Sequence, residues 1–150
     1  MALTKIISGG QTGVDRGALN AAIELGLEHG GWCPRGRRAE NGAIPDRYAL
    51  TETESGAYRM RNERNVLDSD ATLIICRGRL SGGTRLTRQF ARQHHKPYLI
   101  ADLERSPNVE DVRAWLARHP VAVLNVAGPR ESQSPGIAQQ AAAFLKQTLR

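Results

Sequence analysis

The sequence predicts an α/β fold in which a parallel sheet of about five strands carries helices on both faces. Short apolar runs alternate with longer amphipathic stretches along the chain, which is the spacing of repeated strand–helix units. The run ATLIIC at residues 71–76 is apolar almost throughout. A central strand of a parallel sheet has this composition because both of its faces are buried.

Strands are expected at residues 3–8, 31–33, 71–76, 97–103 and 121–128. Helices are expected at residues 14–25, 55–69, 84–95, 107–118 and 137–149. The polar segment 34–48 is expected to be a long loop. The helix over residues 55–69 should turn Met60, Val66 and Leu67 inward.

Local signals set the boundaries of these elements in chain order. The first strand runs into Gly9 and Gly10, and the first helix stops at Gly26. Pro97 ends the helix before the fourth strand, because proline cannot continue a helix. The helix before the last strand has an apolar side made of Val109, Val112, Trp115 and Leu116.

Composition limits the class of protein. The chain has 150 residues and no linker or low-complexity segment, so we expect a single domain over residues 1–150. We find neither a signal peptide nor an apolar run of roughly 18 residues, so a cytoplasmic location is expected and no membrane contact. Cys33 and Cys76 lack CxxC spacing and are expected to be free thiols in a reducing compartment.

The charge balance favours an anionic partner. Lys and Arg number 21 against 15 Asp and Glu, a formal charge of +6. The arginines cluster at residues 35–38, 59–64 and 77–88, beside glycine-rich turns, although any one of them could simply be solvated. Basic residues in turns, without interleaved aromatics, suit a small anion better than a nucleic acid.

Four loops that follow predicted strands are rich in glycine or arginine: SGGQTGVD, CPRGRR, RGRLSGGT and NVAGPRES. In open parallel sheets ligands bind outside the carboxyl ends of the strands. The first loop precedes a helix, so its glycines and the helix N–H groups form an anion site. Gln11 and Thr12 add hydrogen bonds, whereas Asp15 either stabilises the helix dipole or contacts the ligand.

The loop before residue 84 repeats this design. Thr84 and the glycines precede a helix that carries Arg85 and Arg88, which suits phosphate recognition, unless Thr84 is only a helix cap. Helical spacing places Tyr58, Arg61 and their neighbours on one side of the preceding helix. An exposed charged helix explains that spacing equally well.

Evidence for catalysis is thin. The four histidines lie near predicted helix ends without an acid–base partner, and no HExxH or other metal signature occurs. Cys76 ends a strand, where a small buried cysteine is commoner than a reactive one. Nothing in the pattern brings two carboxylates together.

Several segments, read together, are similar to one known family. They are SGGQTGVDRGAL, GWCPRGRRAENG with IPDRYAL, the Thr53–Tyr58–Arg61–Asn65 spacing, DSDATLI, LSGGTRLTRQFA with KPYLIADL, and LNVAGPRES. Over about residues 5–137 the chain resembles the molybdenum cofactor carrier protein family. That family is a circularly permuted branch of the nucleotide-sensing Rossmann-like superfamily related to the lysine-decarboxylase-like phosphoribohydrolases.

The resemblance implies a Rossmann-like doubly wound sheet, a homo-oligomer (a dimer or tetramer) and a basic pocket for a small phosphate-bearing ligand. The ligand would be molybdenum cofactor, a pterin dithiolene with a phosphate and an oxo-molybdenum group. The wider superfamily implies a nucleotide or an ADP-ribose-like molecule instead. Molybdoenzymes or cofactor-synthesis proteins would be the protein partners.

Roles carried over by the resemblance fall on Gly9, Gly10, Gln11, Thr12, Gly13, Asp15, Arg35, Gly82, Gly83, Thr84 and Arg130. The loops and spacing add Ser8, Arg16, Cys33, Arg37, Tyr58, Arg61, Ser81 and Arg85 as expected ligand contacts.

The chain departs from the phosphoribohydrolase pattern PGGxGTxxE, which supplies a glutamate after its glycines. Here Arg85, Arg88 and Gln89 follow instead, which puts hydrolysis by that route in doubt. The leading interpretation is therefore a non-enzymatic carrier or binder of an anionic cofactor. A hydrolase of a nucleotide N-glycosidic or phosphate bond, with Asp15 as acid–base, is the main alternative. A nucleic-acid-binding module is a weaker one.

Overall fold

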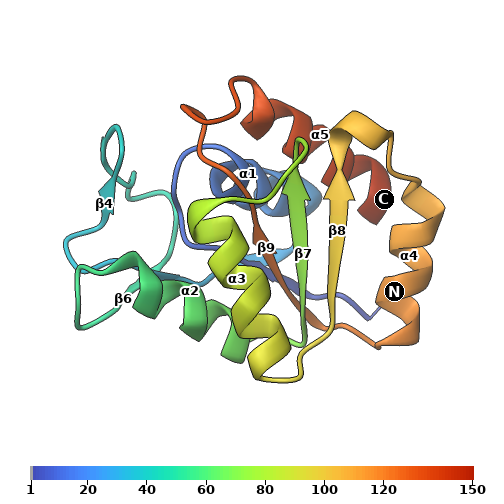
Figure 1. Ribbon diagram of the computed structural model, residues 1–150, viewed down its shortest axis with the longest axis horizontal. Coiled ribbons are helices and arrows are strands. Elements are labelled where there is room, and N and C mark those ends of the chain that lie inside the picture. The colour runs from blue at the N-terminus through green and yellow to red at the C-terminus, as the bar shows by residue number, and fades with distance from the viewer. Residues whose placement is uncertain (1) are drawn as a thin grey trace.

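A computed structural model describes residues 2–150 and confirms the predicted α/β fold, with a parallel sheet between two layers of helices (Figure 1). The five strands of the sheet are β1 (Lys5–Ile7), β2 (Glu28–Gly30), β7 (Ala71–Cys76), β8 (Tyr98–Asp102) and β9 (Val123–Ala127). Their order across the sheet is β2-β1-β9-β7-β8, and every neighbouring pair is parallel. The last strand of the chain therefore lies in the centre.

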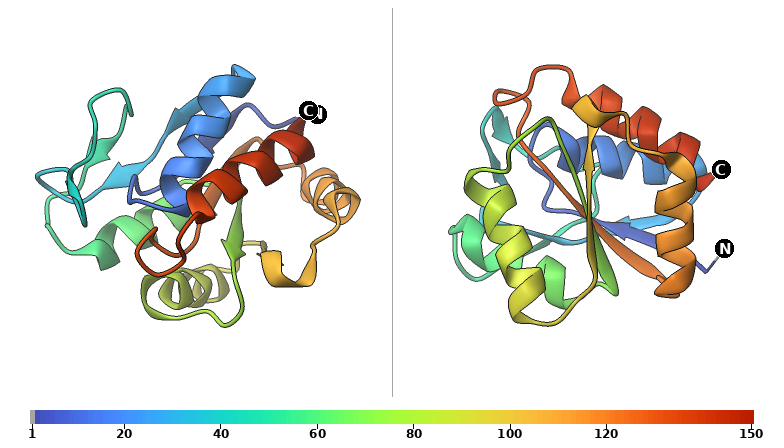
Figure 2. Two further views of the ribbon diagram at one scale, coloured as in Figure 1. Left: turned by 90° about the horizontal axis from the view of Figure 1, so that it is seen from above. Right: turned by 45° about the vertical axis from the view of Figure 1, so that its right-hand side comes forward.

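Helices cover both faces of this sheet. They are α1 (Val14–Leu25), α2 (Tyr58–Leu67), α3 (Gly82–Gln93), α4 (Val109–Arg118) and α5 (Ile137–Leu149), with a short 3₁₀ turn, η1 (Leu103–Arg105). Helix α5 packs against α1 and α4 on one face, and α2 packs against α3 on the other (Figure 2). None of the helices within residues 2–150 has the length and apolar character needed to cross a membrane.

The core is aliphatic, as the low aromatic content predicts. Its largest cluster lies between the sheet and helices α1, α4 and α5, and includes Leu73, Ile75, Leu124 and Leu145. A smaller cluster of Val66, Phe90 and Ala91 joins α2 to α3. Burying these apolar side chains stabilises the fold by roughly 25 cal/mol per Å² removed from water.

Part of the segment that joins α1 to α2 along the chain forms an extension with two short sheets of its own. It contains a parallel pair, β3 (Trp32–Cys33) with β6 (Thr51–Glu52), and an antiparallel hairpin, β4 (Arg38–Ala39) with β5 (Gly42–Ala43). The loop predicted over residues 34–48 therefore carries a hairpin, in which Glu40 and Asn41 form the two-residue turn and Gly42, with a φ of +118°, pairs with Ala39. The strand expected at residues 31–33 belongs to this extension and not to the main sheet.

Two expectations about helices need correction. Leu67, predicted to face inward, is 43% exposed, and Met60 is only half-buried. The buried face of α2 instead carries Arg61, Asn62 and Asn65 together with Val66. Helix α2 borders a polar pocket along part of its length, so its inward face is not apolar. The alternative of a plain exposed charged helix is wrong for the same reason.

The parallel strands place three of the four predicted loops at one edge of the sheet. These are the loops that follow β1, β7 and β9. The fourth loop, CPRGRR, follows β3 in the separate two-stranded sheet, so it does not share this edge. Both cysteines are buried and unpaired.

Candidate functional site

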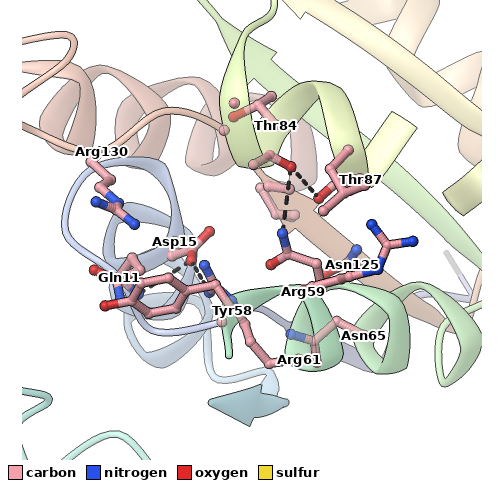
Figure 3. A pocket seen from close by; sticks show the side chains of 18 of the residues that line it. Gln11, Asp15, Tyr58, Arg59, Arg61, Asn65, Thr84, Thr87, Asn125 and Arg130 are labelled. Carbon is pink, nitrogen blue, oxygen red and sulfur yellow. Dashed lines mark hydrogen bonds and ion pairs between the residues drawn. The ribbon is translucent and has the colours of Figure 1, made fainter. Parts of the chain in front are cut away.

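A pocket of about 280 Å³ opens at the carboxyl edge of the sheet, between the loops after β1 and β9 and the helices α2 and α3 (Figure 3). It is lined by Gly9, Gln11, Asp15, Tyr58, Arg59, Arg61, Asn62, Asn65, Gly82, Gly83, Thr84, Leu86, Thr87, Asn125, Val126, Ala127, Gly128, Arg130 and Gln133. Polar and charged side chains therefore predominate over apolar ones. This is the edge where open parallel sheets bind their ligands.

A buried ion pair forms one wall of the pocket. Arg61 Nη1 donates to Asp15 Oδ2 at 2.9 Å, and both side chains are about nine-tenths buried. The same oxygen accepts a hydrogen bond from the Gln11 backbone N–H at 3.2 Å. Burial raises the pKa of Asp15 above its ordinary value of 3.8, although the Arg61 guanidinium opposes this change.

Gly9 makes room for this ion pair. A Cβ at position 9 would lie 1.5 Å from Arg61 Nη1 and 2.5 Å from Arg61 Cζ. A carbon atom packs against a non-bonded heavy atom at about 3.5–4.0 Å. Position 9 therefore has to be glycine for the guanidinium to lie against the backbone beside Asp15.

Arg61 has hydrogen-bonding capacity left over. A guanidinium carries five N–H donors, and within residues 2–150 only Nη1 has an acceptor. Its Nε is buried and has no partner in the described chain. A buried donor without an acceptor costs free energy, so the wall favours any ligand that brings an acceptor to Arg61.

Two further cations line the pocket without a carboxylate to neutralise them. Arg130 packs 5.0 Å from the centroid of the Tyr58 ring, and Arg59 packs 5.0 Å from that of Phe90. Neither arginine forms an ion pair with any residue of the described chain. The aromatic rings thus hold the guanidiniums in place by cation–π contact while their charge stays available.

The beginning of helix α3 adds backbone donors. The first N–H groups of a helix lack intrahelical acceptors, and those of Gly82, Gly83 and Thr84 find none elsewhere in residues 2–150. Thr87 Oγ1 donates to the Gly83 carbonyl at 3.0 Å, and Asn62 Nδ2 does so at 3.5 Å (Figure 3). These two bonds fix the orientation of the first turn. The positive end of the helix dipole therefore adds to the three guanidiniums.

The loop after β1 is largely occupied with holding its neighbours. Thr12 Oγ1 donates to Glu40 and accepts from the Glu131 backbone N–H at 3.2 Å. Gln11 bonds the β4–β5 hairpin with both ends of its amide, through Nε2 to Arg38 O at 3.0 Å and Oε1 to the Glu40 N–H at 3.2 Å. This loop therefore fastens the hairpin and the β9–α5 loop to the sheet edge.

Hydrogen bonds lower the pKa of Glu40, which joins these segments. Ser132 Oγ and Thr12 Oγ1 both donate to its carboxylate and favour the charged form.

The pocket brings together nine of the residues expected from the sequence. They are Gly9, Gln11, Asp15, Tyr58, Arg61, Gly82, Gly83, Thr84 and Arg130. Ten others do not line it: Ser8, Gly10, Thr12, Gly13, Arg16, Cys33, Arg35, Arg37, Ser81 and Arg85.

Most of these ten residues have a structural role in the fold. Cys33 is packed in a core cluster with Leu19, Ile44 and Tyr48, and burial raises the pKa of its thiol. Arg37 donates to three backbone carbonyls of residues 44–48, and Arg16 Nε donates to Gly10 O. Gly10 and Gly13 adopt positive φ values, and Ser8 Oγ donates to Asp15 O. Arg35 and Arg85 are exposed.

Several lining residues were missed by sequence reasoning. Thr87 lies one helical turn after Thr84, so spacing alone could have found it. Asn125 is the polar interruption in the apolar strand VAVLNVA, and its Nδ2 donates to Thr72 Oγ1 at 3.2 Å. Arg59 belongs to the arginine cluster at residues 59–64 but was not singled out from it, and Gln133 carries no local signal.

Within residues 2–150, no group of three His, Cys, Asp or Glu side chains is placed to hold a metal ion. The carboxylates and histidines are dispersed over the fold. Asp15 is the one carboxylate among the residues that line the pocket.

Comparison with known proteins adds two findings. The sequence profile of the circularly permutated YpsA SLOG family matches residues 6–149. The chain is also similar to a crystal structure from Syntrophus aciditrophicus SB named “Putative molybdenum carrier protein”. The two are 48% identical with a TM-score of 0.95, covering 99% of this chain and 96% of the other. No curated protein matches the chain.

Proposed function

The chain belongs to the circularly permutated YpsA SLOG family, and from this premise we propose that its pocket binds and carries a phosphate-bearing pterin of the molybdenum cofactor type. The observation that supports this most is the charge of the pocket. Three guanidiniums and the free amides of α3 face a cavity with a single carboxylate, Asp15. Such a cavity attracts a compact anion such as a phosphate group.

The residues present suit such a cofactor. Arg61 would hold the phosphate with the donors that Asp15 leaves free, and the first amides of α3 would add to them. The amide side chains of Asn125 and Gln133 offer donors and acceptors for the edge of a pterin ring. At about 280 Å³ the cavity is near the small end of ligand sites.

The metal of such a cofactor would be carried by the cofactor itself. Its dithiolene sulfurs supply the ligands to molybdenum, and the described chain offers no cluster of metal-ligating side chains in the pocket. The role of the protein residues is then to bind the phosphate, orient the ring and shield the bound molecule. Carriage in this sense needs no bond-making step by the protein.

Isothermal titration tests the proposal. Molybdenum cofactor released from a molybdoenzyme under anaerobic conditions is titrated into the wild type, Arg130→Gln and Arg85→Gln. Arg130 lines the pocket and Arg85 is an exposed arginine outside it, so the two variants remove the same charge. We expect about ten-fold weaker binding for Arg130→Gln, because one charge-assisted contact is lost. Binding to Arg85→Gln should stay within about two-fold of wild type.

Two results would contradict the proposal. One is the absence of binding by the wild type at sub-millimolar cofactor. The other is an equal loss in both variants, which would show a general effect of net charge and not a contact in the pocket.

A second candidate function follows from Asp15. It is the one carboxyl group among the residues that line the pocket, and a pocket carboxyl can act as a general acid toward a leaving group. As a nucleotide N-glycosidic bond breaks, Asp15 would give its proton to the departing base, the hydroxyl of a water would bond to the sugar carbon, and the remaining proton of that water would return to Asp15. Chromatography after incubation with nucleoside monophosphates would detect the free base. No release by the wild type, or equal release by Asp15→Asn, removes this candidate.

The assembly state and the protein partners stay predictions. A dimer or tetramer and an exchange of cofactor with molybdoenzymes are expected from the family resemblance. Light scattering on the purified protein measures the first, and cofactor transfer to an apo-molybdoenzyme measures the second.

A further inference from the structure

The wall of the pocket that holds Arg61 also carries Asp15, and we propose that this carboxylate makes the pocket select an anion that keeps a proton. The bound group would be a phosphate monoester in its singly charged form, with one P–OH group. This inference rests on the proposed function, because it concerns the anion that the same pocket holds. It identifies Asp15 as the residue that distinguishes a phosphate ester from a sulfate ester of the same shape.

The two carboxylate oxygens of Asp15 have different surroundings. Oδ2 accepts from Arg61 Nη1 at 2.9 Å and from the Gln11 N–H at 3.2 Å, and these bonds meet at one oxygen in Figure 3. Oδ1 accepts no hydrogen bond from residues 2–150. It is nevertheless not an enclosed atom, because the one enclosed side-chain N or O atom without a partner in the described chain is Arg61 Nε. Asp15 Oδ1 is therefore open to the pocket that the residue lines.

Arg61 presents donors beside this open oxygen. Its Nη1 is bonded to Asp15, whereas its Nε and Nη2 have no acceptor among the described residues. Because Nη1 lies 2.9 Å from the carboxylate, the free donors of the same guanidinium lie within a few ångströms of it. An anion held by these donors is thereby placed next to the negative charge of Asp15.

A proton between the anion and Asp15 resolves this conflict of charge. Two like charges so close together repel strongly in a site that is shielded from water. An O–H group of the anion that donates to Oδ1 turns the repulsion into a short, charge-assisted hydrogen bond. A phosphate monoester can supply this group, since its second pKa is about 6. A sulfate monoester has only acceptor oxygens near neutral pH, so one of them would face Oδ1 without a proton.

The charged groups around Asp15 are cations, so no second carboxylate competes for the proton. The titratable and charged neighbours are Arg16 on α1, Tyr58, Arg59 and Arg61 on α2, and Arg130 on the β9–α5 loop. Helix α3 contributes no titratable side chain to the pocket. Burial raises the pKa of Asp15, while Arg61 and Arg130 oppose this change and favour the carboxylate, the form that accepts a hydrogen bond.

Isothermal titration of the wild type with phenyl phosphate and phenyl sulfate tests the inference directly. At about pH 8 we expect the phosphate ester to bind at least about 100-fold more tightly than the sulfate ester. Titration in buffers with different heats of ionisation should show uptake of about one proton per phenyl phosphate bound, because the dianion in solution becomes a monoanion in the pocket. For the same reason, affinity for phenyl phosphate should fall about ten-fold for each pH unit above about 7.

Two variants show whether Asp15 is the cause. Asp15→Asn removes the pocket carboxylate, and Asp111→Asn removes one from an exposed position on α4, on the other face of the sheet. In Asp15→Asn we expect phenyl sulfate to bind at least about ten-fold more tightly than to the wild type, because an amide can donate to a sulfate oxygen. Proton uptake with phenyl phosphate should disappear. Asp111→Asn should keep both the preference and the uptake of the wild type.

Equal affinity of the wild type for the two esters at about pH 8 would overturn the inference, and so would binding of phenyl phosphate without proton uptake. A preference for phosphate that persists in folded Asp15→Asn would also overturn it. Thermal melting shows whether this variant folds; if it does not, the wild-type proton uptake and ester preference decide. If neither ester binds, the inference fails, while titration with molybdenum cofactor still decides the proposed function independently.

Discussion

Replacing Gly9 with alanine should separate Arg61 from Asp15 and thereby disable the pocket. The φ angle of Gly9 is not in the left-handed region, so alanine is compatible with the backbone there. The new Cβ would lie 1.5 Å from Arg61 Nη1, 2.5 Å from Cζ and 2.9 Å from Cδ. A carbon needs about 3.5 Å, so the guanidinium has to move by about 2 Å. A 2.9 Å ion pair with Asp15 does not survive that displacement.

Gly9→Ala should lower the stability of the fold because it leaves a buried charge without its partner. Removing one member of a buried ion pair costs about 3–5 kcal/mol. In Gly9→Ala, Arg61 is displaced and not deleted, and Asp15 can take up a proton. We therefore expect the free energy of unfolding to fall by about 2–3 kcal/mol. For a chain of this length the corresponding fall in melting temperature is about 5–10 °C. Anion affinity should fall at least about ten-fold, since Arg61 no longer lies in the wall.

Thermal unfolding by circular dichroism and ligand titration measure both effects. Gly83→Ala serves as the stability control, because its Cβ would lie 3.5 Å from Asn62 Nδ2 in ordinary contact. Alanine in a helix should raise stability by about 0.5–1 kcal/mol. A melting temperature for Gly9→Ala within about 1 °C of wild type, with unchanged ligand affinity, would refute the reasoning.

Three further outcomes are expected. Because the pKa of Asp15 is raised in the folded state, its contribution to stability is present at low pH and is lost as pH rises above the ordinary 3.8. The stability of the wild type relative to Asp15→Asn, followed by urea unfolding, should therefore decline over that window, and a difference independent of pH would contradict this. Glu40→Gln weakens the hydrogen bonds to Thr12 and Ser132, so limited proteolysis of the β4–β5 hairpin should become faster. An unchanged cleavage rate would show that these hydrogen bonds do not hold the hairpin in place. Burial raises the pKa of Cys76 to about 11, so its alkylation at pH 8 should be about two orders of magnitude slower than that of a free thiol, and rapid labelling of native protein would be inconsistent with this.

The sequence predicts the elements of the fold better than their arrangement. The last helix is expected at residues 137–149 and forms over Ile137–Leu149, and the strand at 71–76 forms as expected. Periodicity and local stop signals are enough for such elements. The central place of β9 could not be predicted, since strand order depends on pairings between distant segments such as Ile7 with Asn125.

The site shows a different kind of failure. An apolar pattern predicts that Met60 and Leu67 of α2 face inward, but its buried face carries Arg61, Asn62 and Asn65. Hydrophobic periodicity assumes that the inner face of a helix meets a core, and α2 meets a polar cavity. Local rules are expected to fail where function places polar groups inside. Helical spacing, which does not depend on hydropathy, places Tyr58, Arg61 and their neighbours on one side of α2.

The glycine turn after β1 has more roles in the fold than its sequence predicts. Its sequence predicts an anion cradle made of loop and helix amides. In the fold, the Val14 N–H donates to Pro129 O at 3.2 Å, and the Thr12 hydroxyl bonds Glu40 and Glu131. The N–H groups of Gly9, Thr12, Gly13 and Asp15 nevertheless make no hydrogen bond within residues 2–150, and neither do those at the start of α3. Both helix starts therefore keep donors for an anion, and Gly9 in addition leaves the space that Arg61 occupies.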